Sequence, residues 1–353
     1  MRFFDAISSL LDIRNSLSKS DKMVSSPGES TAETRRRDST INEENEVYSM
    51  GNIIIAIDHG YGRVKTAHGH FQAGVSAYDT EPIFTHNMLV YQGKYYIIGE
   101  EHKPFLASKI DDPDYYILTL AAIARELKFR GLTSASVHLA IGLPLTWVGQ
   151  QKQAFREYLL QNETADFTFN GVEYHVSFAD ADVFPQGYSA IATQLHSFKG
   201  TNMLCDIGNG TMNIMYINNC RPVLGKCFTE KYGTHQCMLA VREAVMREHQ
   251  AAIDDATIEA VMRFGKADIE EKYLSTMRAA AARYVEGIMR RLKEHDYNPS
   301  LMRLYIVGGG GCLVRNFGKY EPSRVTINDD ICATAKGYEA LVQAKLRKGG
   351  GNA

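Results

Sequence analysis

Two acidic residues occupy equivalent positions in this chain, each after a run of apolar residues and each followed by two glycines one residue apart. The segments run from Asp58 to Gly62 and from Asp206 to Gly210. Glycine lets the backbone N–H groups of such a turn approach an anion without obstruction by a Cβ atom. A carboxylate at the tip of the preceding strand is suited to hold a hydrated Mg²⁺. Each segment predicts an anion-binding turn, and the alternative for either alone is a hairpin whose glycines only make the bend.

Other residues near these turns also suit a bound anion. Lys65 follows Asp58 by seven positions and supplies a positive charge, and Thr211 adds a hydroxyl directly after the second turn. A third glycine turn, Gly308 to Gly311, follows the apolar segment 304–307, and its open backbone permits a flat ligand to lie against it. A flexible linker is the alternative there, although linkers rarely follow a Leu-Tyr-Ile-Val strand.

Apolar periodicity and turn residues predict alternating strands and helices that place the glycine turns at strand ends. The predicted strands cover 53–57, 66–72, 75–78, 86–91, 94–99, 136–141, 166–169, 172–178, 180–184, 202–206, 213–217 and 304–307. The predicted helices cover 114–129, 149–161, 188–196, 233–248, 256–264, 266–293 and 331–344. His138 lies inside a strand and is expected to be a core histidine rather than a catalytic one. Two similar hairpins with helices between them indicate two related α/β domains that face each other across a cleft.

Composition excludes several classes of protein. The 39 basic and 41 acidic residues give no overall bias toward nucleic acid or an anionic membrane. The six cysteines form no CxxC pair and no metal-finger spacing with histidine, which indicates reduced thiols. No apolar run reaches the length of a membrane span, and the start of the chain lacks a signal-peptide pattern. We therefore expect a soluble cytoplasmic protein with no membrane contact and no direct nucleic-acid contact.

The first 49 residues differ from the rest. Residues 2–19 place apolar side chains on one side of a helix, which predicts a short amphipathic helix, whereas 19–49 is polar and is expected to be disordered. Met50 directly precedes the first strand, so a start of translation at Met50, with the leader a gene-calling artefact, stays open. The expected division is a leader at 1–49, a first domain at 50–185 completed by 325–345, a second domain at 186–324, and a flexible tail at 346–353.

Together the three glycine segments resemble the actin, hexokinase and heat-shock chaperone ATPase superfamily. Asp58-x-Gly60-x-Gly62-x-x-Lys65 matches the phosphate-1 pattern, Asp206-Ile-Gly208-x-Gly210-Thr211 matches phosphate-2, and Ile306-Val-Gly308-Gly309-Gly310 matches the adenosine motif. The chain is most similar to the bacterial plasmid-segregation actins of the ParM and StbA type, through 140–145 and 183–188. The resemblance covers about residues 52–345. It implies the α/β actin-like ATPase fold, in which two related ribonuclease-H-like domains surround a nucleotide cleft.

The resemblance also implies roles for individual residues. Asp58 and Asp206 are expected to hold Mg²⁺ through water and to act in catalysis together with Gln186. ATP is the expected nucleotide, although the motifs do not separate ATP from GTP. The residues expected to bind it are Gly60, Tyr61, Gly62, Lys65, Gly208, Asn209, Gly210, Thr211, Gly308, Gly309 and Gly310.

Two positions depart from the family pattern. Gln186 stands where the ParM type has a glutamate, and glutamine cannot act as a general base because its amide has no useful basicity. Gln186 is therefore expected to orient the attacking water, with a polar residue at a helix start as the alternative role. Asn213 replaces the acid that often ends the phosphate-2 motif.

The resemblance implies an ATP-hydrolysing protein that polymerises head-to-tail into filaments for plasmid or DNA segregation, with a DNA-bound adaptor protein as partner. One alternative is a small-molecule, sugar-type kinase, which needs an acid to deprotonate the acceptor hydroxyl. Asp180 and Asp182 are the candidates for that acid, but neither lies in a recognisable kinase motif. A further alternative is a chaperone-like nucleotide switch that does not polymerise, although no separate substrate-binding domain is recognisable in the sequence.

Overall fold

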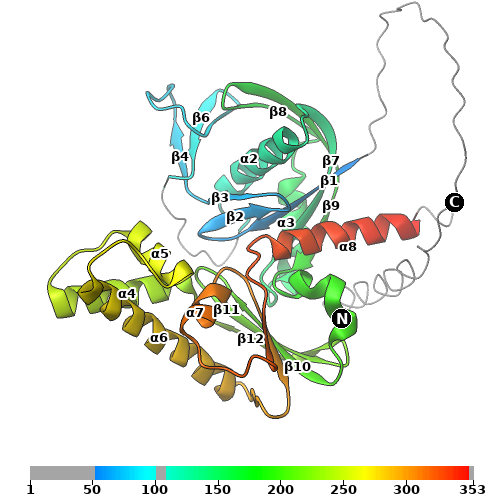
Figure 1. The fold of residues 1–353 in the computed structure, drawn as a ribbon. Helices are drawn as coiled ribbons and strands as arrows, with labels where there is room; N and C mark the ends of the chain where they lie inside the picture. Colours follow the sequence, from blue (N-terminus) through cyan, green and yellow to red (C-terminus); the bar gives the residue numbers. More distant parts are fainter. Residues whose placement is uncertain (1–51, 101–108, 350–353) are drawn as a thin grey trace, which may run out of the picture.

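The computed structural model describes residues 52–100 and 109–349, which form two β-sheets with helices packed against them (Figure 1). The predictions for the leader, and those for residues 350–353 of the tail, lie outside the described residues. Among the helices of the described ranges, none combines the length and the apolar character needed to cross a bilayer.

The first sheet has nine strands in the order β3-β2-β1-β7-β9-β8-β5-β6-β4. These are β1 (Ile53–His59), β2 (Arg63–Thr66), β3 (His70–Gln72), β4 (Val75–Tyr78), β5 (Met88–Tyr91), β6 (Lys94–Ile98), β7 (Ser134–Leu143), β8 (Thr164–Phe169) and β9 (Val172–Pro185). The parallel strands β1, β7 and β9 form its centre, and the continuous apolar run of β1 is typical of a strand covered on both faces. Helices α2 (Asp114–Phe129) and α3 (Val148–Leu159) pack with this sheet in one hydrophobic core.

The second sheet has five strands in the order β12-β11-β10-β13-β14. These are β10 (Thr201–Ile207), β11 (Met212–Asn218), β12 (Arg221–Glu230), β13 (Arg303–Val307) and β14 (Val325–Ile327). A second core joins this sheet to helices α4 (Thr234–His249), α5 (Asp255–Phe264), α6 (Glu271–Glu294) and α7 (Gly311–Phe317).

The two sheets share one arrangement around their glycine turns. In each, a buried strand turns back into an antiparallel hairpin, β1 with β2 and β10 with β11. The same buried strand pairs in parallel with a later one, β1 with β7 and β10 with β13. The turns therefore lie at the carboxyl ends of parallel strands, which is where open α/β sheets bind ligands.

A third hydrophobic core lies between the two sheets. It joins the short 3₁₀ helix η1 (Tyr188–Ser197) and the C-terminal helix α8 (Ala333–Gly349) to apolar side chains from both sheets. In Figure 1, α8 runs between them. Gly337 of α8 lies so close to the backbone of Ser189 that no Cβ atom fits between them. The two helices thus fix the sheets relative to each other, and with them the turns.

Several predicted elements differ in detail. The predicted strands 172–178 and 180–184 form one continuous strand, β9, whose register against β7 shifts between Val137 and His138. The predicted helix 188–196 is a 3₁₀ helix, and α6 begins at Glu271 rather than at 266. Strands β12 and β14 were not predicted, because β12 contains Pro222 and Gly225 at a sheet edge and β14 spans only three residues. Helix α8 continues to Gly349, past the predicted end at residue 344.

Candidate functional site

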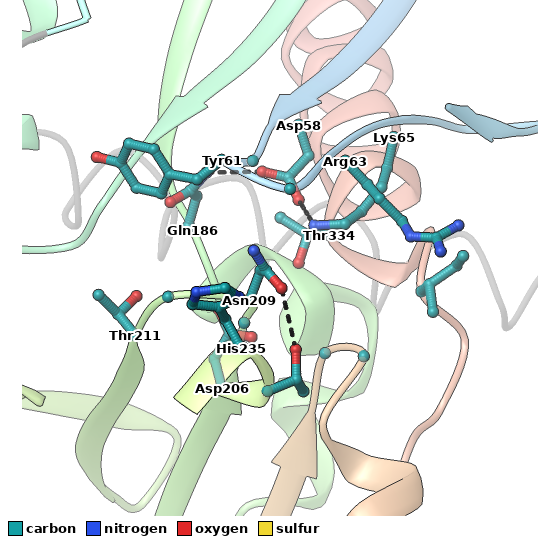
Figure 2. Close-up of a pocket in the computed structure, with 18 of the residues that line it drawn as sticks. Asp58, Tyr61, Arg63, Lys65, Gln186, Asp206, Asn209, Thr211, His235 and Thr334 are labelled. Carbon is teal, nitrogen blue, oxygen red and sulfur yellow. Dashed lines mark hydrogen bonds and ion pairs between the residues drawn. The ribbon is translucent and has the colours of Figure 1, made fainter. Parts of the chain in front are cut away.

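The two predicted anion-binding turns face each other across a cleft between the sheets (Figure 2). The predicted residues that line this cleft are Asp58, Gly60, Tyr61, Gly62, Lys65, Gln186, Asp206, Gly208, Asn209, Gly210, Thr211, Gly308 and Gly309. Gly310 is not among the lining residues. Its N–H donates to the carbonyl of Ile207 at 2.9 Å, and its missing Cβ lets the turn pack against the Ile207 side chain. Gly310 therefore holds the third glycine turn against β10.

In the first hairpin, Asp58 is tightly held by two donors. Lys65, its partner in the register of β1 and β2, donates to Oδ2 at 2.9 Å. Gln186, directly after β9, donates from Nε2 to Oδ1 at 2.6 Å. Burial is the largest single influence and would raise the pKa of Asp58, but Lys65, Lys109 and the hydrogen bond from Gln186 together outweigh it, so the pKa lies below its ordinary value. Asp58 is therefore an ionised carboxylate with a fixed orientation.

In the second hairpin, Asp206 has a different environment. In the pairing of β10 with β11, Asn213 lies opposite Asp206. An amide therefore occupies the position that Lys65 has in the first hairpin. Burial raises the pKa of Asp206 to about 7; Lys65 lowers it, and the neighbouring carboxylate of Asp58 raises it further. Asp206 therefore exchanges its proton close to neutral pH.

The two turns touch each other directly. A Cβ atom at Gly62 of the first turn would lie 2.6 Å from Nδ2 of Asn209 in the second. A side chain at position 62 would therefore displace the side chain of Asn209. The glycine at this place does more than make a bend, because it lets the two walls of the cleft come into contact here.

Helix α4 fixes the second turn from behind. The backbone N–H groups of Thr234 and His235, at its first turn, donate to the carbonyls of Gly208 and Asn209 at 3.0 and 2.9 Å. The hydroxyl of Thr234 also donates to the side chain of Asn209 at 3.2 Å, which Figure 2 marks with a dashed line. Because these carbonyls are held by the helix, the turn presents its glycine backbone to the cleft.

The third glycine turn lies beside Asp206. Gly308 adopts a φ of +85°, and a Cβ atom there would lie 2.5 Å from Oδ1 of Asp206. On the other side of the same carboxylate, a Cβ atom at Gly187 would lie 3.0 Å from Oδ2. Two glycines thus make the space that the half-buried carboxylate occupies, and its desolvation there is the main cause of its raised pKa.

Sequence reasoning missed a buried lysine beneath the first turn. Nζ of Lys109 donates to the carbonyl of His59 at 2.6 Å and lies above the rings of Tyr115 and Phe155. Burial lowers the pKa of Lys109 to about 8 and that of His59 to about 3, so His59 is neutral. Nothing in the sequence around Lys109 separates it from a surface lysine, because its burial depends on rings contributed by α2 and α3.

An ion pair between the two sides of the cleft was also not predicted. Arg63 of β2 lies 2.6 Å from Glu259 of α5, and both side chains line the cleft. Arg263, one turn later on α5, lies 3.5 Å from the same carboxylate. The partners are 196 residues apart in the chain, so only the tertiary structure brings them together.

The donors present suit Mg²⁺ bound through water. Within the described ranges, no group of three or more His, Cys, Asp or Glu side chains is arranged to hold a metal ion. Asp58 and Asp206 supply carboxylates from opposite walls, and both oxygens of Asp58 already accept hydrogen bonds. Mg²⁺ commonly retains several waters and takes one or two carboxylates together with substrate phosphates. The site fits that kind of binding and not a cage of protein ligands.

The acids considered for a kinase lie elsewhere. Asp180 pairs with Arg156 at 2.5 Å, and Asp182 pairs with His138 at 3.0 Å and with Lys345 at 2.7 Å. Neither acid lines the cleft. The hydrogen bond to Asp182 gives His138 the structural role expected of it, and neither Asp180 nor Asp182 is placed in the cleft as the base that the kinase alternative needs.

Family models match two parts of the chain. A family model described as the actin-like proteins N-terminal domain matches residues 56–188. A second, described as the archaeal actin homologue MreB-like C-terminal domain, matches residues 204–317. No curated protein sequence matches the chain.

Solved structures share the fold at low sequence identity. The actin-like protein Alp7A superposes with a TM-score of 0.67 at 14% identity, covering 85% of this chain and 98% of its own. An Alp12 filament structure superposes with a TM-score of 0.58 at 17% sequence identity, covering 83% of this chain and 98% of its own. ParM of Bacillus thuringiensis with ATP superposes with a TM-score of 0.62 at 12% sequence identity, covering 84% of this chain and 99% of its own. At such identities the likeness concerns the fold, and it confirms the predicted fold class of two α/β domains around a cleft.

Proposed function

The chain belongs to the actin-like superfamily, and on this premise we propose that it binds and hydrolyses ATP and polymerises head-to-tail into filaments that segregate plasmid or other DNA. The observation that carries the proposal is the pair of glycine turns, each with a carboxylate, that face each other across one cleft. A hairpin bend alone needs neither the acids nor their opposed placement. The similarity to ParM with ATP supports the proposed ATP binding, and the similarity to a filament of Alp12 supports the proposed polymerisation.

The turns suit a triphosphate held from both sides. Backbone N–H groups of 61–62 and 209–210 are proposed to donate to the β- and γ-phosphates, with Lys65 supplying positive charge beside them, whereas those of Gly60 and Gly208 already donate to the carbonyls of Asp58 and Thr211 within the turns. Tyr61, Asn209 and Thr211 line the same space. The nucleoside is proposed to lie against Gly308 and Gly309, where the glycine backbone leaves room for a flat ring.

We assign Gln186 to orienting the attacking water. Its Nε2 group donates to Asp58, so the amide is fixed and its oxygen is the group able to accept from water. Asp58 and Asp206 would hold Mg²⁺ through water, and Mg²⁺ when bound neutralises charge on the phosphate oxygens. Hydrolysis then rests on positioning and electrostatics, because no side chain in the proposal acts as a strong base.

Nucleotide state is proposed to control assembly. Residues 50–185 with 325–345, and 186–324, are proposed as the two domains that form the walls of the cleft. A γ-phosphate bridging both turns favours the closed cleft and subunit association, and its loss weakens the polymer. A DNA-bound adaptor protein in the cytoplasm is the proposed partner, since the chain itself carries no overall basic charge.

Phosphate release tests the catalytic part. Asp206→Ala is expected to reduce ATP hydrolysis by roughly two orders of magnitude or more, because the carboxylate faces the proposed metal. The matched control is Asp166→Ala, which removes an exposed acid paired with His175 outside the cleft and leaves turnover unchanged. Full activity in Asp206→Ala would contradict the assignment.

Sedimentation and negative-stain imaging with ATP and with ADP test the assembly part. Filaments are expected with ATP and a higher critical concentration with ADP, since ADP cannot bridge both turns. A chain that stays monomeric with ATP at high concentration rules out polymerisation. ATP consumption that requires an added sugar would instead favour a kinase.

A further inference from the structure

We propose that Lys109 is a positioning residue of the nucleotide site, which fixes the first glycine turn from beneath and holds a positive charge under the phosphates that this turn receives. The inference deepens the proposed ATP binding and rests on it, but it does not depend on polymerisation. Lys109 precedes α2 in the chain and does not itself line the cleft, so it acts through the turn that it contacts.

Lys109 is buried to an extent that is unusual for a lysine. The residue is 1% exposed, and its ammonium lies over the rings of Tyr115 and Phe155, 5.5 and 5.8 Å from their centroids. Among the residues that the structure describes, no carboxylate accepts a hydrogen bond from it. Lysine is almost never fully buried unless it is paired, because desolvation of the ammonium is costly. A buried ammonium without a carboxylate of its own is suited to a site that receives an anion.

The ammonium holds the peptide that begins the glycine turn. Nζ of Lys109 donates to the carbonyl of His59 at 2.6 Å. The N–H at the other end of the same peptide, that of Gly60, donates to the carbonyl of Asp58 at 3.0 Å. Both polar groups of this planar peptide are thus engaged, so it cannot rotate without losing a hydrogen bond. Lys109 therefore fixes the direction of the two N–H groups that follow, those of 61–62, which are proposed to meet the phosphates.

The imidazole of His59 adds no second charge beneath the turn. The hydroxyl of Thr119 donates to the carbonyl of Tyr115 at 2.7 Å, so it accepts from Nε2 of His59, which lies 2.8 Å away. The single ring proton is therefore assigned to Nε2 from this network. Burial and the ammonium of Lys109 lower the pKa of His59 to about 3, in agreement with a neutral ring. Lys109 is thus the cation under this part of the turn.

The charge of Lys109 is expected to depend on bound phosphate. Burial lowers its pKa to about 8, the carboxylate of Asp58 on β1 opposes this, and the ammonium of Lys65 on β2 adds to it. The other titratable groups that face it from the described elements are His59 and Tyr115, both neutral at this pH, and α3 contributes only a phenyl ring. Bound phosphates favour the ammonium. ATP is therefore expected to bind more tightly when Lys109 is protonated, and its affinity falls as pH rises through about 8.

Lys109→Met tests the role, because methionine keeps apolar contact with the rings but has neither the charge nor the donor. With Mg²⁺ at pH 7.5, the affinity for ATP is expected to fall roughly tenfold or more, since the charge and the fixed peptide are lost together. Adenosine, which has no phosphates, is expected to bind as before. Competition against a fluorescent ATP analogue measures both affinities. The matched control is Lys128→Met, which removes an exposed lysine of α2 and leaves both affinities unchanged.

A pH profile of the unaltered chain tests the charge without a variant. Its affinity for ATP is expected to fall about tenfold between about pH 7.5 and 9.5, while that for adenosine stays level. Lys65 does not cause such a fall because, despite burial, the carboxylate of Asp58 raises its pKa above the ordinary 10.5. Asp206, with a pKa of about 7, has largely lost its proton at the start of this range. Lys109→Met and Lys109→Arg should both give flat profiles, the arginine variant at the higher affinity because it stays charged.

The outcomes separate this inference from the proposed function. If the unaltered chain binds no ATP, the proposed function falls and this inference falls with it. If the chain binds ATP and Lys109→Met binds it equally well, only the role of Lys109 is overturned. Equal losses of affinity for ATP and adenosine in Lys109→Met would show that the lysine supports only the shape of the cleft. A level ATP profile in the unaltered chain overturns the charge even if the variant fails to fold.

Discussion

In the hairpin of β1 and β2, the register places Lys65 opposite Asp58; in the hairpin of β10 and β11, the corresponding register places Asn213 opposite Asp206. In both, the partner follows the acid by seven positions. The strands, the turns and the place of the acid agree, yet the pKa of Asp58 is lowered and that of Asp206 is raised to about 7. Desolvation acts on both acids and Asp58 is the more buried of the two, so the cross-strand residue, a lysine in one hairpin and an asparagine in the other, separates a permanent negative charge from one that depends on pH.

The two walls of the cleft therefore control the charge of their acids in different ways. The first hairpin keeps a charged acid by surrounding it with cations, Lys65 by direct contact and Lys109 from beneath. The second hairpin has no cation opposite its acid, which lies half-buried against Gly187 and Gly308. A cation that arrives at Asp206 below about pH 7 displaces a proton, so its binding is expected to be coupled to pH.

Breaking the first pair is expected to have the largest effect. Lys65→Met removes the ammonium from a carboxylate whose side chain is only 6% exposed. Loss of one partner of a buried pair destabilises the fold by about 3–5 kcal/mol, which chemical denaturation measures directly. The matched change in the other hairpin is Asn213→Ala, which removes only hydrogen bonds and is expected to cost about 1 kcal/mol. Equal losses for the two variants would contradict the comparison.

Neutralising each acid in turn is expected to shift stability in opposite directions. Because the folded pKa of Asp206 is raised, stability falls as pH rises from about 4 to 7. Asp206→Asn should abolish that loss and be more stable than the unaltered protein at pH 8, by roughly 2 kcal/mol or more, with no difference near pH 4.

The folded pKa of Asp58 is lowered, so ionised Asp58 stabilises the fold above the unfolded pKa of 3.8. This stabilisation is lost as the pH falls. Asp58→Asn should accordingly be less stable at neutral pH.

The measurement is denaturation with a chelator present at several pH values. Asp166→Asn, at an exposed acid, is the control for general charge effects. Parallel pH profiles for the Asp58 and Asp206 variants would show that the hairpins do not differ in the way described.

A lysine opposite Asp206 should lower the pKa of this acid and so make the second hairpin resemble the first. Asn213→Lys places an ammonium opposite Asp206 on the cleft side of β11. An opposite charge at this distance lowers a carboxylate pKa by about 1–3 units, which corresponds to about 1–4 kcal/mol at pH 7. The fall in stability between pH 4 and 7 should shrink, and carboxylate titration followed by infrared or NMR spectroscopy should show the shift. An unchanged titration of Asp206 would mean that burial alone sets its pKa.

The smallest effect is expected from the link between the two walls. Glu259→Gln removes the ion pair with Arg63, whose side chains are 36% and 29% exposed. Pairs with this exposure contribute about 1 kcal/mol or less, and the effect should vanish at about 1 M salt. The control is Glu271→Gln, which breaks a pair with Arg278 inside α6. Only Glu259→Gln should speed the release of bound nucleotide, because only that pair spans the cleft; equal release rates would contradict this role.

The sequence by itself determined the local parts of this protein. A glycine turn, the acid before it and the residue seven positions later are encoded within one hairpin, and so the spacing predicted both turns and the residues that line them. The helix at 114–129 has the predicted ends because its apolar period and flanking residues are local signals. Strand β12 was missed because a sheet edge tolerates Pro222 and Gly225, and no local pattern reveals such a strand.

The tertiary structure alone decided the electrostatics and the cross-chain contacts. In the sequence, Lys109 cannot be distinguished from a surface lysine, because its burial depends on α2 and α3. Arg63 and Glu259 are 196 positions apart in the chain, so only the folded structure brings them into contact. The pKa of Asp206 likewise depends on Gly187 and Gly308, which come from separate segments of the chain. Local spacing encodes where a backbone turns, whereas burial and charge pairing depend on which distant segments pack around the turn. The acids of the two hairpins are therefore alike in sequence and different in charge.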